Sequence, residues 1–174
     1  MTGTGPMVEI FDSRMEITNP GEPLVDTLRF IDTPPKSRNE TLAAMMRRMK
    51  ICEEAGTGID KVIEAVEAFQ LPAPDFTAIT TTQPGFTKAT LYAPRRLNDM
   101  DSKERIRACY QHACLCLVTG SRMTNTSLRN RFGIKPESSA QASRLIREAL
   151  KTQVIKLYDP DVRARDRSYL PFWA

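Results

Sequence analysis

The sequence predicts an α+β protein built from two parts, which we divide between residues 97 and 98. The first part (1–97) alternates short strand-like and helix-like segments, whereas the second part (98–174) has the pattern of three helices followed by two strands. Charge divides the chain at about the same place. Residues 101–174 hold 14 Lys and Arg against 7 Asp and Glu, whereas residues 1–100 hold 11 against 14. A basic half joined to a mildly acidic half suggests a nucleic-acid-binding module attached to a second domain.

Composition is that of a folded protein. With 174 residues, of which 41% are hydrophobic, the chain can bury a core. Cys109, Cys114 and Cys116 lie close together and Cys52 stands alone, which is not the spacing of a disulfide framework and fits reduced thiols. No secretory signal opens the chain, and the apolar run 113–118 is too short to cross a bilayer. We therefore expect a cytoplasmic protein that does not contact a membrane.

The first part should open with a β-hairpin. Apolar and polar residues alternate over 8–12 and over 15–18, on either side of a Ser-Arg pair. Asn-Pro-Gly at 19–21 has strong turn chemistry and ends the second strand. The proline-rich stretch 22–36 is then expected to be mostly loop.

Two helices and two more strands should follow. Asn39 is a plausible N-cap for the first helix, whose apolar residues recur at helical spacing: Leu42, Met45, Met46 and Met49. Gly-Thr-Gly at 56–58 interrupts the pattern. The second helix has one apolar face and is stopped by prolines: Ile59, Val62, Ile63, Val66, then Pro72 and Pro74. The segments 76–82 and 86–92 look like strands around Pro84-Gly85.

The second part has the element order of a winged helix-turn-helix domain. Ser102 should cap a helix running to about Val118, and Gly133 should stop a short helix over 125–132. Ser138 or Ser139 should cap a longer helix reaching Thr152. Two strand-like runs, 154–158 and 168–173, enclose a polar loop rich in arginine. Three helices followed by a two-stranded hairpin is the order of a winged helix.

The helix predicted over 138–152 divides lengthwise into an apolar and a basic face. The apolar face is Ala142, Leu145, Ile146, Ala149 and Leu150; the opposite face is Ala140, Gln141, Arg144, Arg147 and Lys151. A helix that enters the major groove needs this division, because one face docks on its domain while long donors reach base edges and phosphates. Ser139 is one of the small residues at the helix start that let backbone N–H groups approach a phosphate. Duplex DNA is the expected partner.

Further arginines should extend this surface. Arg163, Arg165 and Arg167 of the hairpin loop could reach along the minor groove or bind flanking phosphates, and Arg129 and Arg131 could grip the backbone. Two alternatives remain open. Charged side chains on an exposed helix face are usually only solvated, and some winged helices bind proteins instead of DNA.

Several motifs resemble one family. Residues 8–21, Val-Glu-Ile-Phe-Asp-Ser-Arg-Met-Glu-Ile-Thr-Asn-Pro-Gly, resemble the hairpin of bacterial transcriptional regulators described as C-terminal regions of RecG-related ATP-dependent helicases. Arg-Asn at 38–39 and Glu-Ala-Gly-Thr-Gly-Ile at 54–59 come in the order which that family shows. Ser-Arg-Leu-Ile at 143–146 and the end 169–174 are similar to its winged-helix tail. The resemblance implies a GHKL-like nucleotide-binding domain over 1–97 and a winged helix over 98–174.

The sequence also departs from the family. Full-length members resemble a three-part protein with an AlbA/Schlafen-type domain in front, and they carry an Asn-rich segment before the hairpin, similar to the metal-chelating box of GHKL ATPases. Residues 1–7 do not supply it, and Glu22 stands where the family usually has a second glycine. The resemblance thus implies an incomplete α/β sandwich. Its remnant nucleotide site would be Gly21, Arg38, Asn39, Gly56 and Gly58, although a Gly-x-Gly can equally serve a turn.

These observations predict a DNA-binding transcriptional regulator that is not an enzyme and binds no cofactor, since ATP and Mg²⁺ would need a longer chain. We expect a homodimer, because an unpaired strand edge in the first part invites association. The alternative is a GHKL-type ATPase whose winged helix docks a protein. Cys109, His112 and Cys116 share one helical face and could bind zinc. Structural zinc sites want four ligands, however, and cysteines acting as small core residues are the simpler interpretation, so we expect no metal.

Overall fold

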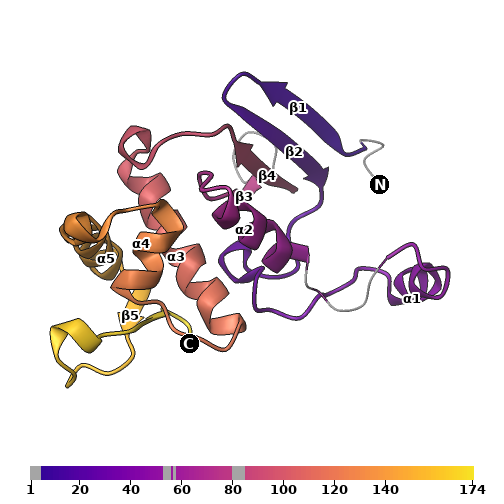
Figure 1. The fold of residues 1–174 in the computed structure, drawn as a ribbon. Coiled ribbons are helices and arrows are strands. Elements are labelled where there is room, and N and C mark those ends of the chain that lie inside the picture. Colours follow the sequence, from indigo (N-terminus) through magenta and orange to yellow (C-terminus); the bar gives the residue numbers. More distant parts are fainter. Residues whose placement is uncertain (1–4, 53–55, 57, 80–84) are drawn as a thin grey trace.

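A computed structural model of the chain describes residues 5–52, 56, 58–79 and 85–174. Within these residues the protein has a four-stranded antiparallel sheet, a two-stranded hairpin, five α-helices and four short 3-10 helices (Figure 1). The predicted α+β fold is therefore confirmed. No helix in the described part of the chain combines the length and apolar character needed to cross a membrane.

The first four strands form one antiparallel sheet in the order β1-β2-β4-β3. Their bounds are β1 Met7–Phe11, β2 Arg14–Pro20, β3 Asp75–Ile79 and β4 Phe86–Tyr92. β1 and β2 form the predicted hairpin, and β4 lies between β2 and β3 although it follows both in the sequence. The strand predicted over 76–82 is confirmed as far as Ile79, and its last three residues lie outside the described ones.

The sheet has one polar and one apolar face. On the polar face the carboxylate of Glu16 lies 2.5 Å from Arg14 Nε and 3.0 Å from Lys88 Nζ. On the apolar face the strand register aligns one row across all four strands: Val8, Ile17, Ala89 and Phe76. Phe30, which follows the 3-10 helix η1 (Thr27–Arg29), packs on Phe76 with ring centroids 5.6 Å apart. The apolar face is thus covered at its β3 end.

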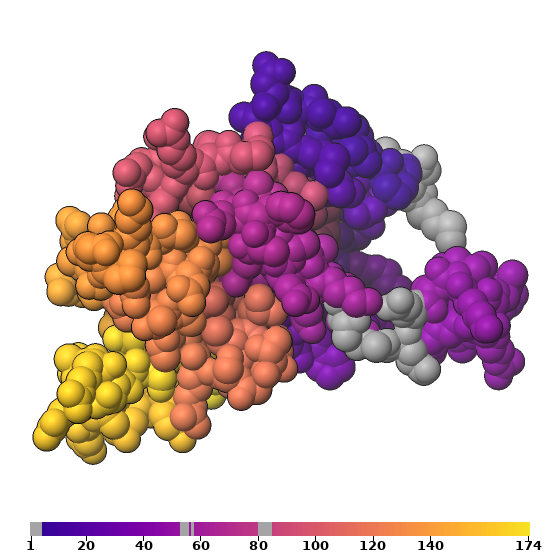
Figure 2. Space-filling view, in the orientation of Figure 1, coloured from indigo at the N-terminus to yellow at the C-terminus, as the bar shows by residue number. Residues whose placement is uncertain are grey.

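Two helices belong to the first part. Helix α1 (Glu40–Arg48) begins as predicted, because the Asn39 side chain accepts a hydrogen bond from Leu42 N at 2.9 Å. It has no buried residue and stands away from the rest of the molecule (Figures 1 and 2). Helix α2 (Gly58–Ala68) buries Ile63 and contacts α3.

The second part packs three helices and a hairpin. These elements are α3 Ser102–Val118, α4 Asn125–Phe132, α5 Ser139–Lys151, β5 Ile155–Leu157 and β6 Tyr169–Pro171. The predicted order is confirmed. Each helix buries its apolar positions against the others, and Cys109, Ala113 and Leu128 are fully enclosed. Short 3-10 turns precede α3, α5 and β6: η2 Leu97–Asp99, η3 Pro136–Ser138 and η4 Ala164–Asp166.

The predicted cap of α3 is wrong, whereas Ser138 holds the predicted cap position of α5. Asp101, not Ser102, caps α3: its carboxylate accepts from Glu104 N at 2.8 Å, while the Glu104 carboxylate accepts from Asp101 N at 3.0 Å. This reciprocal pair is a capping box, and a carboxylate at each position satisfies two free N–H groups at once. At α5, Ser138 holds the cap position without a side-chain hydrogen bond, because η3 already winds the chain into the helix.

The two parts share one buried cluster. Ile63 and Ala73 from the first part belong to the same cluster as the apolar residues of α3. Gln111 Nε2 of α3 donates to Pro74 O at 2.8 Å, and Arg107 pairs with Asp75 at 3.4 Å. The division between residues 97 and 98 therefore stays a prediction, and the second part is held against the first through α3.

Candidate nucleic-acid interface

Helix α5 presents the basic face that the sequence predicts. Its buried side is formed by Ala142, Leu145, Ile146 and Ala149, and the side chains of Arg144, Arg147 and Lys151 are exposed. None of these three cations lies within ion-pair distance of a carboxylate in the described part of the chain. Their charges are therefore directed at solvent or at a partner, because no neighbouring acid neutralises them.

A groove of about 590 Å³, here called the arginine groove, lies between the start of α4, α5 and the β5–β6 loop. Its polar lining is Asn125, Thr126, Ser139, Ser143, Arg147, Arg165 and Arg167. No described carboxylate lines it. Three arginines together with hydroxyl and amide groups form a surface that attracts phosphate by charge and by hydrogen bonding.

One amide braces the walls of this groove. Asn125 Nδ2, at the first position of α4, donates to Ser143 Oγ at 3.0 Å and to Ser139 O at 3.3 Å. Its other atom, Oδ1, accepts from Arg129 Nε at 3.1 Å. Arg129 also donates to Thr126 Oγ1 at 3.2 Å. The guanidinium of Arg129 is thereby held against the start of α4, beside the groove.

Arg144 and Gln141 lie on the other flank of α5. They line a separate hollow of about 310 Å³ with Arg105 and Glu148, and Gln141 Nε2 donates to Asn98 Oδ1 at 3.1 Å. The basic face predicted as one unit is therefore split. Arg147 faces the loop arginines, whereas Arg144 and Gln141 face the residues that lead into α3.

The loop arginines differ in their surroundings. Arg163 is exposed, and Arg165 is exposed beside its neighbour Asp166, whose carboxylate lies 3.3 Å from Arg165 Nε. Arg167 is half-buried and lines the arginine groove. Two of the three predicted loop arginines thus share a groove with α5.

Arg131 does not belong to this surface, so the expectation that it grips the DNA backbone is wrong. Its side chain is 1% exposed, its Nη2 donates to Leu71 O at 2.6 Å, and its Nε lies 3.4 Å from the Glu67 carboxylate. Burial lowers the pKa of Arg131, and Glu67 acts in the opposite direction. The sequence spacing could have indicated this burial, because Leu128, Arg131 and Phe132 occupy the i, i+3 and i+4 positions that form the buried side of α4.

His112 lies in the same buried network. Its Nδ1 is 2.8 Å from Glu67 Oε2, its Nε2 is 3.0 Å from Ser127 Oγ, and Cys116 Sγ lies 3.6 Å from Nε2. Burial lowers the pKa of His112, but Cys116 and Glu67 outweigh it and raise the pKa to about 9. Sequence reasoning did not identify Glu67, although it lies one helical turn after Ile63 on the buried side of α2, because its partners come from α3 and α4.

The zinc alternative has no geometry to support it. Cys109 Sγ lies 3.9 Å from Met123 Sδ instead of beside His112, and burial raises the pKa of its thiol. The described residues contain no group of three side chains placed to bind a metal ion.

Most of the predicted nucleotide-site residues meet in the first part. Gly21, Arg38 and Gly56 line one hollow of about 480 Å³ with Lys36 and Thr87, here called the glycine pocket. Asn39 and Gly58 do not line it, because Asn39 caps α1 and Gly58 begins α2. Thr57, between the two glycines, lies outside the described residues.

Backbone geometry explains both glycines of the pocket. Gly21 has φ +110°, and a Cβ there would lie 2.9 Å from Arg38 Nη2. Arg38 donates to Glu22 O across this glycine. Gly56 has φ +65°, and a Cβ there would lie 2.9 Å from Pro35 Cδ. Only glycine adopts these conformations without strain and leaves the approach open.

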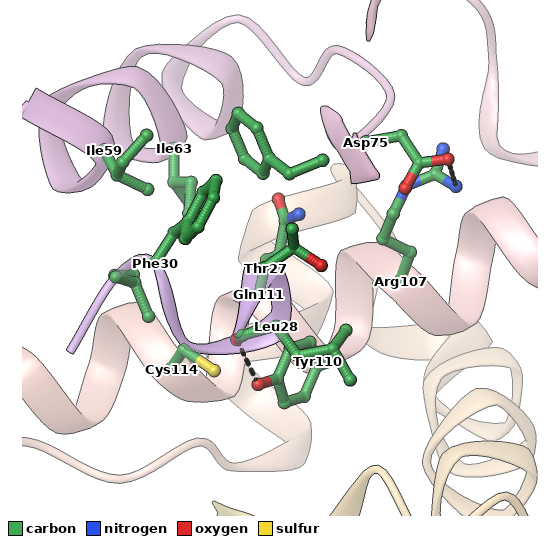
Figure 3. A pocket seen from close by; sticks show the side chains of 12 residues that line it. Thr27, Leu28, Phe30, Ile59, Ile63, Asp75, Arg107, Tyr110, Gln111 and Cys114 are labelled. Carbon is green, nitrogen blue, oxygen red and sulfur yellow. Dashed lines mark hydrogen bonds and ion pairs between the residues drawn. The ribbon is translucent and has the colours of Figure 1, made fainter. Parts of the chain in front are cut away.

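A much smaller cavity, of about 40 Å³, lies between η1, α2 and α3 (Figure 3). Phe30, Ile59 and Ile63 form its apolar wall, and the Asp75–Arg107 ion pair stands at its edge. Gln111 extends into the space between them. The volume suits one or two water molecules and is too small for a nucleotide.

Comparison with known proteins supports a relationship for the first part. A family model described as "Putative ATP-dependent DNA helicase recG C-terminal" matches residues 3–84, which confirms the RecG-related resemblance there. Among solved structures, the DIP2311 protein from Corynebacterium diphtheriae is similar, with 13% sequence identity and a TM-score of 0.41. The match covers 92% of this chain and 44% of that chain, so this chain spans less than half the length of that protein. No curated protein matches.

Proposed function

We propose that the second part is a winged helix that binds duplex DNA, and that the protein is a transcriptional regulator. The observation that supports this proposal is the arginine groove, which Arg147 of α5 lines together with Arg165 and Arg167 of the loop, with Asp166 beside Arg165. An exposed helix beside a basic hairpin loop is the shape that such domains present to DNA.

In this proposal α5 enters the major groove and the β5–β6 loop follows the backbone. Arg144 and Gln141 on one flank are nearest to base edges, while Arg147, Arg165 and Arg167 neutralise phosphates on the other. Asn125 fixes the spacing of α4 and α5 through Ser143, so the two helices meet DNA as one rigid unit. Lys151, in the last turn of α5, adds a further phosphate contact.

The test is fluorescence anisotropy with a labelled duplex of about two helical turns, measured over a range of salt concentrations. Combined replacement of Arg147, Arg165 and Arg167 by alanine should weaken binding and flatten the plot of log K against log salt by about 2–3 in slope, since each phosphate contact contributes about 0.9. Lys103→Ala, an exposed cation of α3 outside the groove, is the matched control. Unchanged affinity and slope in the triple variant would exclude the groove as a DNA site.

Nucleotide binding by the first part is a second candidate function. It is favoured by the glycine pocket, where Gly21, Arg38 and Gly56 meet inside the region matched by the RecG-related model. The two cations Lys36 and Arg38 suit phosphate, whereas the backbone N–H of Gly21 already donates to Gly85 O. Glu22 is the only carboxylate of the described lining, which is a poor set for Mg²⁺, so binding is proposed without hydrolysis.

A thermal shift with ATP, with and without magnesium, tests this second candidate. A rise in melting temperature that Arg38→Ala abolishes would support it, because a ligand that binds only the folded state stabilises it by mass action. The same shift in Arg38→Ala, or no shift in the native chain, would exclude the pocket. If the triple groove variant also left DNA binding unchanged, the winged helix would remain as a docking module for a protein.

A further inference from the structure

The first part exposes an unusual amount of apolar surface. Of the fifteen large apolar side chains that the described residues expose, twelve lie before residue 70. Five of these twelve lie in two places, one on the sheet and one on α1. Contiguous exposed apolar surface of this kind marks an interaction site in a stable protein.

The first place is the outer end of the apolar sheet face, here called the bare patch: Val8, Ile10, Met15 and Ile17. Val8 is 57% and Ile10 80% exposed. The strand register places all four on the face that Phe30 covers further along, at Phe76. The apolar face of the sheet therefore extends past the part that Phe30 covers, and its β1 end is exposed. β1 is also an edge strand, exposed along its whole length.

The second place is one side of α1, here called the α1 stripe: Leu42, Met45, Met46 and Met49. Leu42, Met45 and Met49 are each more than half exposed, and no residue of the helix is buried. Figure 2 shows α1 as a separate lobe at the edge of the molecule. A nine-residue helix is marginal in water by itself, so a packed partner would stabilise it.

We propose that these two surfaces join two copies of this chain, with the α1 stripe of each copy packed on the bare patch of the other. A helix on the apolar face of a sheet is the layer arrangement that buries both. Each chain carries both the helix and the sheet face of such a layer, but its own α1 lies away from its own sheet (Figure 1). A two-fold axis makes each contact twice, as in most homodimers.

Charge complementarity favours this partner. Arg48 and Lys50 flank the α1 stripe, while Asp12 lies in the turn of the hairpin that carries the bare patch. None of these three has an ion-pair partner among the described residues of its own chain. Docking between copies would bring the two cations toward the Asp12 carboxylate on both sides of the axis.

The proposed dimer encloses apolar side chains from both surfaces of each copy. Each copy contributes both its bare patch and its α1 stripe, so the two contacts together enclose all eight of these side chains from each chain. Methionines suit such a surface, because their flexible side chains adapt to irregular neighbours.

Sedimentation equilibrium of the full chain over a wide concentration range tests association. The native chain should show twice the monomer mass at high concentration. Ile10→Lys and Met45→Lys should each raise the dimer dissociation constant at least tenfold, because each places a charge in both contacts. Met7→Lys, on the opposite face of β1, and Thr41→Lys, off the stripe, are the matched controls. A monomer at every concentration would overturn the proposal.

Cross-linking identifies the contact and its partner. In a Cys52→Ser background the remaining described thiols are buried, so an introduced cysteine is the reactive one. Mixing an Ile10→Cys chain with a Met45→Cys chain under mild oxidation should give a disulfide between the two chains in preference to either self-pair. Exclusive Ile10→Cys self-pairs would indicate β1 edge pairing instead. A bond formed only within one doubly substituted chain would show α1 closing on its own sheet. Either outcome overturns the proposal, and neither depends on DNA binding.

Discussion

Nδ1 of His112 lies 2.8 Å from Oε2 of Glu67, and this contact joins α3 of the second part to α2 of the first. Glu67 also faces Arg131 of α4, with its Oε1 3.4 Å from Arg131 Nε. One carboxylate therefore serves two buried cations from two helices. The network ties the two parts together through charge as well as through apolar packing.

Stability should depend on pH through His112. Its pKa of about 9 in the folded protein exceeds the ordinary value of 6.5, so the folded state holds this proton more tightly than the unfolded state. The resulting stabilisation is complete below pH 6.5 and is lost as pH rises through 9. Denaturant unfolding at a series of pH values should show a loss of about 3 kcal/mol over this range that His112→Gln does not show. A parallel pH dependence in both proteins would contradict the assignment.

Removing the shared carboxylate should destabilise the fold strongly. Glu67→Gln leaves Arg131 buried without a counter-charge, and breaking a buried pair from one side typically costs about 3–5 kcal/mol. The measurement is urea unfolding of the variant, with Glu64→Gln, an exposed position of α2, as control. Adding Arg131→Met to Glu67→Gln should recover part of the loss, because the uncompensated charge is then gone. If the double variant were less stable than Glu67→Gln, the penalty would have another source.

The capping box of α3 predicts different effects for adjacent residues. Asp101→Ala removes the acceptor for Glu104 N and should lower the melting temperature, whereas Ser102→Ala should leave it unchanged. The hydrogen bond from Glu104 N also lowers the pKa of Asp101, so the effect of the cap should fade as acid protonates this carboxyl. Thermal melts at neutral and acidic pH compare the two variants. Equal destabilisation by both substitutions would argue for a second cap.

The two flanks of α5 should have separable effects on DNA. Arg144→Ala should weaken binding to a preferred sequence by about 1–3 kcal/mol and relax discrimination among sequences, because a base contact is lost. Lys151→Ala should weaken binding to all sequences alike and reduce the salt slope by about 1. Competition assays with several duplexes distinguish these patterns. Uniform weakening by Arg144→Ala would place it on phosphate instead.

Periodicity predicted the local elements because each signal lies within one segment. Alternation located β1 and β2, and the apolar spacing of α5 fixed which side it buries. The strand order could not be predicted, since the position of β4 between β2 and β3 depends on pairings more than 60 residues apart in the chain. The spacing of α4 places Arg131 on the buried side of that helix, but no local pattern identifies its partner Glu67, which comes from another helix.

The candidate sites were likewise predictable from spacing only where their residues lie close together in the sequence. Gly21, Arg38 and Gly56 come from three separate segments, and their order in a known family, not their spacing, brought them together in advance. Residues on α5 were predicted as one basic face, yet Arg144 and Arg147 line different hollows. The loop conformation after β5 decides which of them meets Arg165, and no short-range pattern encodes that conformation.

Helix α2 connects the glycine pocket of the first part to helices α3 and α4 of the second. It starts just beyond Gly56, and near its other end Glu67 grips both α3 and α4. Because Glu67 contacts both helices, α2 cannot move without moving α4 or breaking the ion pair with Arg131. A displacement of the start of α2 would therefore be transmitted through Glu67 to α3 and α4.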